Sequence, residues 1–164
     1  MSILALDSGL DRLGYSVFDR EPSLGKPVTY ITSGLIQTDK KKTTSERLAT
    51  IYDEVAALLN THKPETMVLE KLFFFKNQKT VIEVAQAQGV TLLVAAQKGI
   101  PTDYLTPLQI KQIVTGYGSA DKKAVQKMLG LILGLDPSLL KQDDQADAIA
   151  CGLAYCLLNK TLVR

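Results

Sequence analysis

The sequence predicts an α/β protein with a mixed five-stranded sheet flanked by helices. Two observations carry this prediction: three strand-like segments open the chain, and from residue 45 onward helical segments alternate with short apolar strands. The length of 164 residues is that of one ordinary domain, and a content of 46% hydrophobic residues suffices for a packed core. We therefore expect residues 1–164 to form a single domain.

The first three strands are predicted at residues 2–7, 15–19 and 28–38. The segment SILALD is apolar, YSVFD alternates, and VTYITSGLIQT is rich in β-branched residues. The segment SGLDRLG is expected to turn between the first two strands, and EPSLGKP is expected to be a loop. Because these connections are short, the three strands should form an antiparallel meander.

The later strands should join the sheet in parallel, because each follows a helix. The first helix could be capped by Ser45 and ends at Pro64, and the segment TMVLE after it is apolar until its last residue. Helices are predicted over residues 45–64, 78–99, 107–116, 120–135 and 142–156, and strands over residues 66–70 and 101–106.

Acidic residues stand at the ends of two predicted strands and at the start of the last helix. Asp7 ends the first strand and Glu70 the fourth, while Asp144 and Asp147 share a helix face because they are three residues apart. If these strands are neighbours and the helix crosses their edge, four carboxylates converge without His or Cys. Their repulsion calls for a hard cation, Mg²⁺ or Mn²⁺, and two such ions roughly 4 Å apart can cleave a phosphodiester.

Each acid alone also has a structural explanation. Asp143 or Asp144 could cap the last helix, and Asp147 would then be favoured in its first turn by the helix dipole. Asp7 could open a turn, and Glu70 could be a solvated strand end. The conjunction of these acids with the predicted strand order is what favours a metal site.

Four segments carry a second line of evidence: ILALDSGLDRLGYSVFD, VLEKLFFFKNQKTVIEVAQAQGV, VTGYGSADKKAVQKML and DDQADAIACGLAYC. In this order and spacing, from residue 2 to about residue 157, they resemble the RuvC family of bacterial Holliday-junction resolvases. The resemblance implies an RNase H-like fold, a homodimer, and Mg²⁺-dependent cutting of two opposed strands at a four-way DNA junction. Carried onto matching positions, it implies that the catalytic and metal-binding residues are Asp7, Glu70, Asp144 and Asp147.

Two positions depart from the family pattern. Ser8 stands where the family most often has Pro, and Gln145 stands where a small residue is common. Neither departure removes a carboxylate, so the expected chemistry is unchanged. Two ions per subunit are expected, with Mn²⁺ able to substitute for Mg²⁺.

Candidate DNA-binding residues surround these acids, although the net charge of +2 does not by itself indicate nucleic acid. By the resemblance, Phe73 contacts a base near the cut, and Lys111 and Lys122 contact the backbone. Alternatively, the phenylalanines cover the sheet and the lysines form a solvated face. The full set expected to bind DNA is Phe73, Phe74, Lys76, Asn77, Lys111, Lys122 and Lys123.

Partners and compartment follow from the same patterns. The apolar helix over residues 80–97 is the expected homodimer interface, or else it is buried within one subunit. Cys151 and Cys156 lie on different sides of a helix and should not pair, as in a reduced compartment. No signal peptide or membrane span is evident, so a cytoplasmic location is expected. In relatives a RuvA–RuvB branch-migration complex works alongside the nuclease and could be a further partner.

Two other functions stay open at this point. One is a related RNase H-like nuclease that acts on RNA or on an RNA–DNA hybrid. The other is a junction-binding scaffold without catalysis, which the four intact acids argue against.

Overall fold

The computed structural model describes residues 1–20, 28–72 and 78–158 of the chain. Its strands are β1 (Ser2–Asp7), β2 (Arg12–Asp19), β3 (Thr29–Gln37), β4 (Thr66–Glu70) and β5 (Thr102–Leu105). They form one sheet in the order β3-β2-β1-β4-β5. The pairs β1–β2 and β2–β3 are antiparallel, whereas β1–β4 and β4–β5 are parallel. The predicted mixed five-stranded sheet is therefore confirmed.

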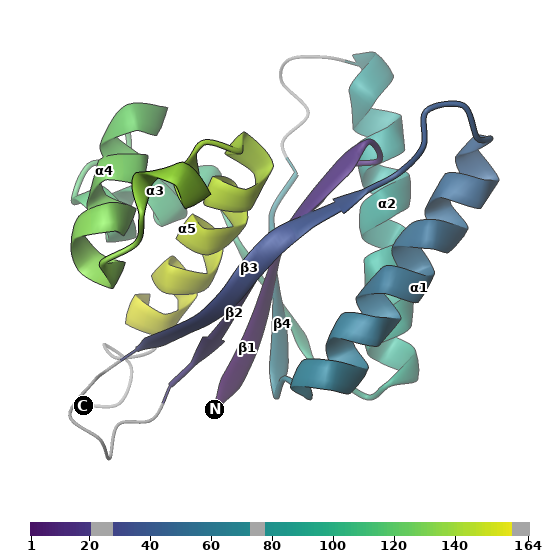
Figure 1. Cartoon of the computed structure of the whole chain (residues 1–164), viewed down its shortest axis with the longest axis horizontal. Helices are drawn as coiled ribbons and strands as arrows, with labels where there is room; N and C mark the ends of the chain where they lie inside the picture. The colour runs from purple at the N-terminus through teal and green to yellow at the C-terminus, as the bar shows by residue number, and fades with distance from the viewer. Residues whose placement is uncertain (21–27, 73–77, 159–164) are drawn as a thin grey trace.

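Helices cover both faces of this sheet. They are α1 (Thr44–His62), α2 (Gln78–Gln97), α3 (Pro107–Thr115), α4 (Lys122–Leu133), the 3-10 helix η2 (Pro137–Leu140) and α5 (Asp143–Leu158). Helices α1 and α2 lie on one face, and α3, α4 and α5 lie on the other (Figure 1). None of these described helices has both the length and the apolar character needed to cross a bilayer.

The core has two halves because successive side chains of a strand point to opposite faces. In β1, Ile3 and Ala5 pack with α5, whereas Leu4 and Leu6 pack with α1 and α2. The α5 half also contains Cys151 and Cys156, which are both buried.

Two local predictions at element boundaries are wrong. Thr43 caps α1 instead of Ser45, because Thr43 Oγ1 accepts from Glu46 N at 3.3 Å and Glu46 Oε2 accepts from Thr43 N at 2.8 Å. Strand β2 begins at Arg12 instead of residue 15, so the turn after β1 is shorter than predicted. As a result Gly14, expected in that turn, pairs with Asp7.

Helix α5 lies very close to β2, because β2 presents small residues to it. A Cβ atom at Gly14 would lie closer than 3.0 Å to the backbone oxygen of Asp144, and one at Gly152 would overlap the ring of Phe18. Ser16 Oγ donates a buried hydrogen bond to Ala148 O at 2.7 Å. These contacts fix the start of α5 against the end of β2 nearest Asp7.

Candidate active site

The two strand-ending acids lie side by side. Asp7 is the last residue of β1 and Glu70 the last of β4, and the preceding residues, Leu6 and Leu69, are direct partners in the parallel pair. Val68 packs on the α5 face as Ile3 and Ala5 do, so alternation turns both carboxylates toward α5.

The first turn of α5 brings the other acids to this edge. The backbone oxygen of Gln142 accepts from Ala146 N at 2.9 Å, which places Asp143 and Asp144 inside the first turn. The alternative that either residue is the N-cap is therefore wrong. Because the Asp144 backbone packs on Gly14, and Gly14 pairs with Asp7, the start of α5 lies beside the end of β1.

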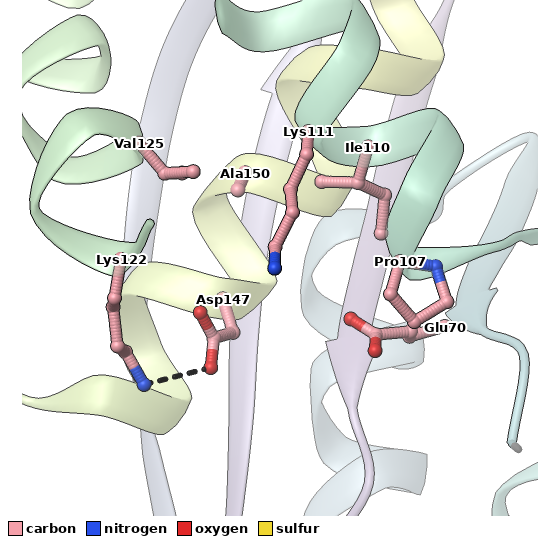
Figure 2. A pocket seen from close by; sticks show the side chains of 8 residues that line it. All are labelled: Glu70, Pro107, Ile110, Lys111, Lys122, Val125, Asp147 and Ala150. Atoms are coloured by element: carbon pink, nitrogen blue, oxygen red, sulfur yellow. Dashed lines mark hydrogen bonds and ion pairs between the residues drawn. The ribbon is translucent and has the colours of Figure 1, made fainter. Parts of the chain in front are cut away.

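A pocket of about 280 Å³ opens between these elements. Figure 2 shows the Lys111 side chain extending from α3 toward the space between Asp147 and Glu70. Lys122 enters from α4 and points to Asp147. The residues that line the pocket are Glu70, Pro107, Ile110, Lys111, Lys122, Val125, Asp147 and Ala150.

Two basic side chains, those of Lys122 and Arg12, form ion pairs with the acids of α5. Lys122 Nζ lies 3.1 Å from Asp147 Oδ2 and 3.3 Å from Asp143 Oδ1. Arg12 Nε lies 2.8 Å from Asp144 Oδ2. That oxygen is buried and accepts no hydrogen bond within the part of the chain that the structure describes, so its contact with Arg12 is ionic only.

The carboxylates raise one another's pKa values. Burial and then the charge of Asp147 raise the pKa of Asp7 to about 8, with Glu70 and Asp144 adding to the effect. Burial and Asp147 raise the pKa of Glu70 to about 7, against the opposing charges of Lys111 and Lys122. Burial also raises the pKa of Asp147, although Lys122 opposes it. The four acids therefore form one coupled electrostatic group.

This donor set fits a hard divalent cation. Four carboxylates supply oxygen ligands alone, their mutual repulsion is unfavourable without added positive charge, and Asp144 Oδ2 lacks a hydrogen-bond donor. Across residues 1–20, 28–72 and 78–158, no three ligand side chains are already arranged around a common ion position. Two of the four acids, Asp144 and Asp147, form ion pairs with Arg12 and Lys122 instead.

The turn after Asp7 is braced by a buried arginine. Arg47 of α1 forms an ion pair with Asp11 and donates from Nε to Thr38 Oγ1 at 2.8 Å. Thr38 Oγ1 in turn donates to Leu10 O at 2.7 Å. On the β4 side, Gln88 Nε2 donates to the backbone oxygen of Glu70 at 3.0 Å. These bonds hold the ends of both acid-bearing strands.

The predicted DNA-binding residues have different positions. Lys111 and Lys122 line the pocket with the acids, while Lys123 lines a separate groove. Four others lie outside the described residues: Phe73, Phe74, Lys76 and Asn77. Arg12 is a site residue that the sequence does not predict, because SGLDRLG is typical of a turn. In the structure Arg12 begins β2 and forms an ion pair with Asp144.

The raised pKa of Asp7 predicts a pH-dependent stability difference. Folded metal-free protein keeps a proton on Asp7 where the unfolded chain, with a pKa near 3.8, has lost it, so ionisation opposes folding. The contribution of Asp7 to the unfolding free energy thus falls as pH rises from about 4 to about 8. The variant Asp7→Asn should gain stability relative to wild type across this range, measured by urea unfolding with EDTA.

A matched control for this series is Asp53→Asn on the exposed side of α1. It leaves the four acids of the site in place, so the stability gain expected for Asp7→Asn should be absent. A stability difference for Asp7→Asn that stays constant with pH would contradict the raised pKa.

Comparisons with known proteins add to this geometry. A family model described as crossover junction endodeoxyribonuclease RuvC matches residues 3–155. The crossover junction endodeoxyribonuclease RuvC of Thermosipho melanesiensis is 43% identical over 161 residues, covering 98% of this chain and 99% of the relative. The same-named protein of Fusobacterium nucleatum is 45% identical over 155 residues, covering 94% of this chain and 80% of that protein.

A solved structure gives the same result for the fold. T. thermophilus RuvC in complex with a Holliday junction substrate superposes with a TM-score of 0.88 at 28% identity, covering 98% of this chain and 96% of that one. The expected RNase H-like resolvase fold is therefore confirmed.

Proposed function

Since the chain belongs to the RuvC family of crossover junction endodeoxyribonucleases, we propose that it resolves four-way DNA junctions by paired nicking of two opposed strands. One observation carries the residue-level proposal: β1, β4 and α5 each deliver acids to one edge of the sheet, where Asp7, Glu70, Asp144 and Asp147 are electrostatically coupled. We assign these four residues as the catalytic carboxylates.

The same four carboxylates would hold two Mg²⁺ ions per subunit, with Mn²⁺ as a substitute. Nucleases of this family are metal-dependent. When bound, the ions supply an activated water nucleophile and neutralise charge on the leaving 3′ oxygen. Asp7 interacts electrostatically with Glu70 of β4 and with Asp144 and Asp147 of α5, and it would contact both ions. The products would be nicks with 5′ phosphates that a ligase can seal.

Lys122 would change partners when ions and DNA bind. Lys122 now neutralises Asp147 and Asp143, a task that a divalent cation would take over. Its ammonium group would then be free to contact a DNA phosphate beside Lys111. We keep Phe73, Phe74, Lys76 and Asn77 as proposed DNA contacts, whereas Lys123 lines a separate groove.

A homodimer would supply two such sites for two opposed strands. Helix α2 has an exposed apolar face that could form the dimer interface. Its Ala87, Val94 and Ala95 pack on the core, whereas Ile82 and Leu93 on the other face are 63% and 53% exposed. The alternative that α2 is wholly buried within one subunit is therefore wrong. On the exposed face, a Cβ at Gly89 would meet no atom of the described residues within 4 Å, which leaves room there for close helix approach.

The variant Leu93→Lys should weaken dimerisation by about 30-fold or more, because a central buried anchor contributes about 2 kcal/mol. Sedimentation equilibrium would measure the dissociation constant. Ile31→Lys, at a residue 50% exposed on edge strand β3, is the control that should leave dimerisation unchanged. An unchanged constant for Leu93→Lys would place the interface elsewhere.

A panel of substrates tests the proposed reaction. Wild-type protein with Mg²⁺ would be incubated with a mobile four-way DNA junction, linear duplex and RNA–DNA hybrid. We expect paired, ligatable nicks in the junction alone. Preferential cutting of the hybrid would favour an RNase H-like nuclease, and tight junction binding without cutting would favour a scaffold.

Three further proposals concern context. Residues 1–164 would act as one nuclease domain. The buried free thiol of Cys151 fits a reduced compartment, so we place the protein in the cytoplasm. A RuvA–RuvB branch-migration complex would be its partner at the junction.

A further inference from the structure

A second groove lies on helix α4, away from the carboxylates. Gly134 caps the C-terminal end of α4 and adopts a left-handed conformation with a φ of 67°. The chain then turns back through η2. Gln126 Nε2 donates to Leu140 O at 2.9 Å and ties α4 to η2. The space between them is about 530 Å³, larger than the catalytic pocket, and α4 lies at the outer edge of the molecule (Figure 1).

This α4–η2 groove combines apolar and cationic side chains. Its lining residues are Lys123, Gln126, Lys127, Gly130, Leu131, Leu135, Pro137, Leu140 and Lys141. Leu131 is 69% exposed and would gain from burial by an occupant of the groove. No acid is among the lining residues, and none of the three lysines forms a salt bridge within the described ranges. The nearby Asp136 accepts from Ser138 N at 2.7 Å.

The groove is separate from the catalytic pocket. The two hollows share no lining residue, although Lys122 and Lys123 are adjacent in the chain. One residue step turns a helix by about 100°, so Lys122 faces the acids while Lys123 lies on the next face of α4. An occupant of the groove therefore need not displace DNA from the carboxylates.

We propose that the α4–η2 groove binds a short acidic peptide segment of a partner protein, anchored by apolar side chains. The three lysines outnumber the one nearby acid, Asp136, and so complement an acidic segment. The exposed leucine and the proline gain from burial against apolar side chains, which a DNA backbone does not offer. Unpaired bases would call for aromatic stacking partners, and no aromatic residue is among the described residues that line the groove. The volume is in the range that encloses a small ligand or a few peptide side chains.

Fluorescence anisotropy with labelled synthetic peptides tests this proposal. The probe carries Asp and Glu residues around a Leu-Leu pair, and a control peptide has Ser-Ser in its place. Wild-type protein should bind the probe and should bind the Ser-Ser peptide at least about tenfold more weakly. Equal binding of both peptides, or none of the probe at millimolar concentration, would overturn the proposal.

Variants locate the binding. Leu131→Ser and Lys141→Glu change exposed side chains of the groove, and each should weaken probe binding by about tenfold. Lys41→Glu is the matched charge reversal outside the groove and should leave binding unchanged. Gly130→Leu should also block the probe, because Gly130 lines the groove and the new side chain would occupy it. A Cβ at this position makes only ordinary contacts, 3.8 Å from Leu135 O and 4.0 Å from Leu140 Cδ1.

Junction DNA separates this proposal from a DNA-binding role of the groove. The Leu131→Ser and Lys141→Glu variants should cut a junction at the wild-type rate, and an excess of junction DNA should not displace the probe. Displacement of the probe, together with slower cutting by both variants, would show that the groove is part of the DNA surface. Because probe binding is measured without cutting, its outcome is independent of the proposed nuclease function.

Discussion

Replacing Asp7 by Asn should slow junction cutting by about 10³-fold or more and leave junction binding intact or tighter. The Asp7 carboxylate is coupled to Glu70, Asp144 and Asp147. Losing it would remove a ligand to the ions, whose charge stabilisation of the transition state is several kcal/mol, and each 1.36 kcal/mol is tenfold in rate. Binding should not suffer, because the variant removes a negative charge that repels phosphate.

Single-turnover cutting of a four-way junction, with gel-shift binding beside it, measures both effects. Asp53→Asn, which removes an equal charge from the exposed side of α1, is the control and should cut normally. Cutting by Asp7→Asn at the wild-type rate would mean that the four-carboxylate site is wrong.

Replacing Gly14 by Ala should lower the unfolding free energy by about 3 kcal/mol or more and reduce cutting. A Cβ at this position would lie closer than 3.0 Å to the backbone oxygen of Asp144, and neither a strand nor a helix backbone can yield as a flexible side chain does. The start of α5 would have to move off β2, and Asp144 and Asp147 would move with it.

Urea denaturation measures the stability change. Gly130→Ala in α4 is the control, because its Cβ would make only ordinary contacts at 3.8 Å and 4.0 Å. That variant should gain roughly 0.5–1 kcal/mol, since Ala is the better helix former. If Gly14→Ala is as stable as wild type, α5 does not lie on β2 as described.

The part of the site on the strands could be predicted from the sequence, because strand alternation is a local property. The series Ile3, Ala5, Asp7 marks one face of β1, and Val68 and Glu70 mark the same face of β4 once the two strands are neighbours. The helix–strand order predicted that β4 joins the sheet in parallel, while its place beside β1 was only a condition of the prediction.

The parts that could not be predicted depend on contacts between distant segments. Arg12 lies in SGLDRLG, whose Gly and Asp content is typical of a turn, and only pairing with β1 makes residues 12–14 a strand. Its ion pair with Asp144 joins residues far apart in the chain. Similarly, Lys122 and Lys123 look like one basic patch in the sequence, and only the packing of α4 assigns them to two hollows.

The cations Arg12 and Lys122 have a consequence for metal binding. They neutralise Asp144 and Asp147 in the folded protein, so an entering divalent ion must compete with two ion pairs. The side chains of Arg12 and Lys122 are 51% and 42% exposed, so solvent is open to both when their carboxylate partners bind an ion.

Anomalous diffraction from crystals grown with Mn²⁺ tests the central claim most directly. Manganese peaks should lie about 2 Å from carboxylate oxygens of Asp7, Glu70, Asp144 and Asp147, with Arg12 and Lys122 turned away from their present partners. If Mn²⁺ binds elsewhere, and Asp144 and Asp147 keep their ion pairs with Arg12 and Lys122, the four acids are not the metal site.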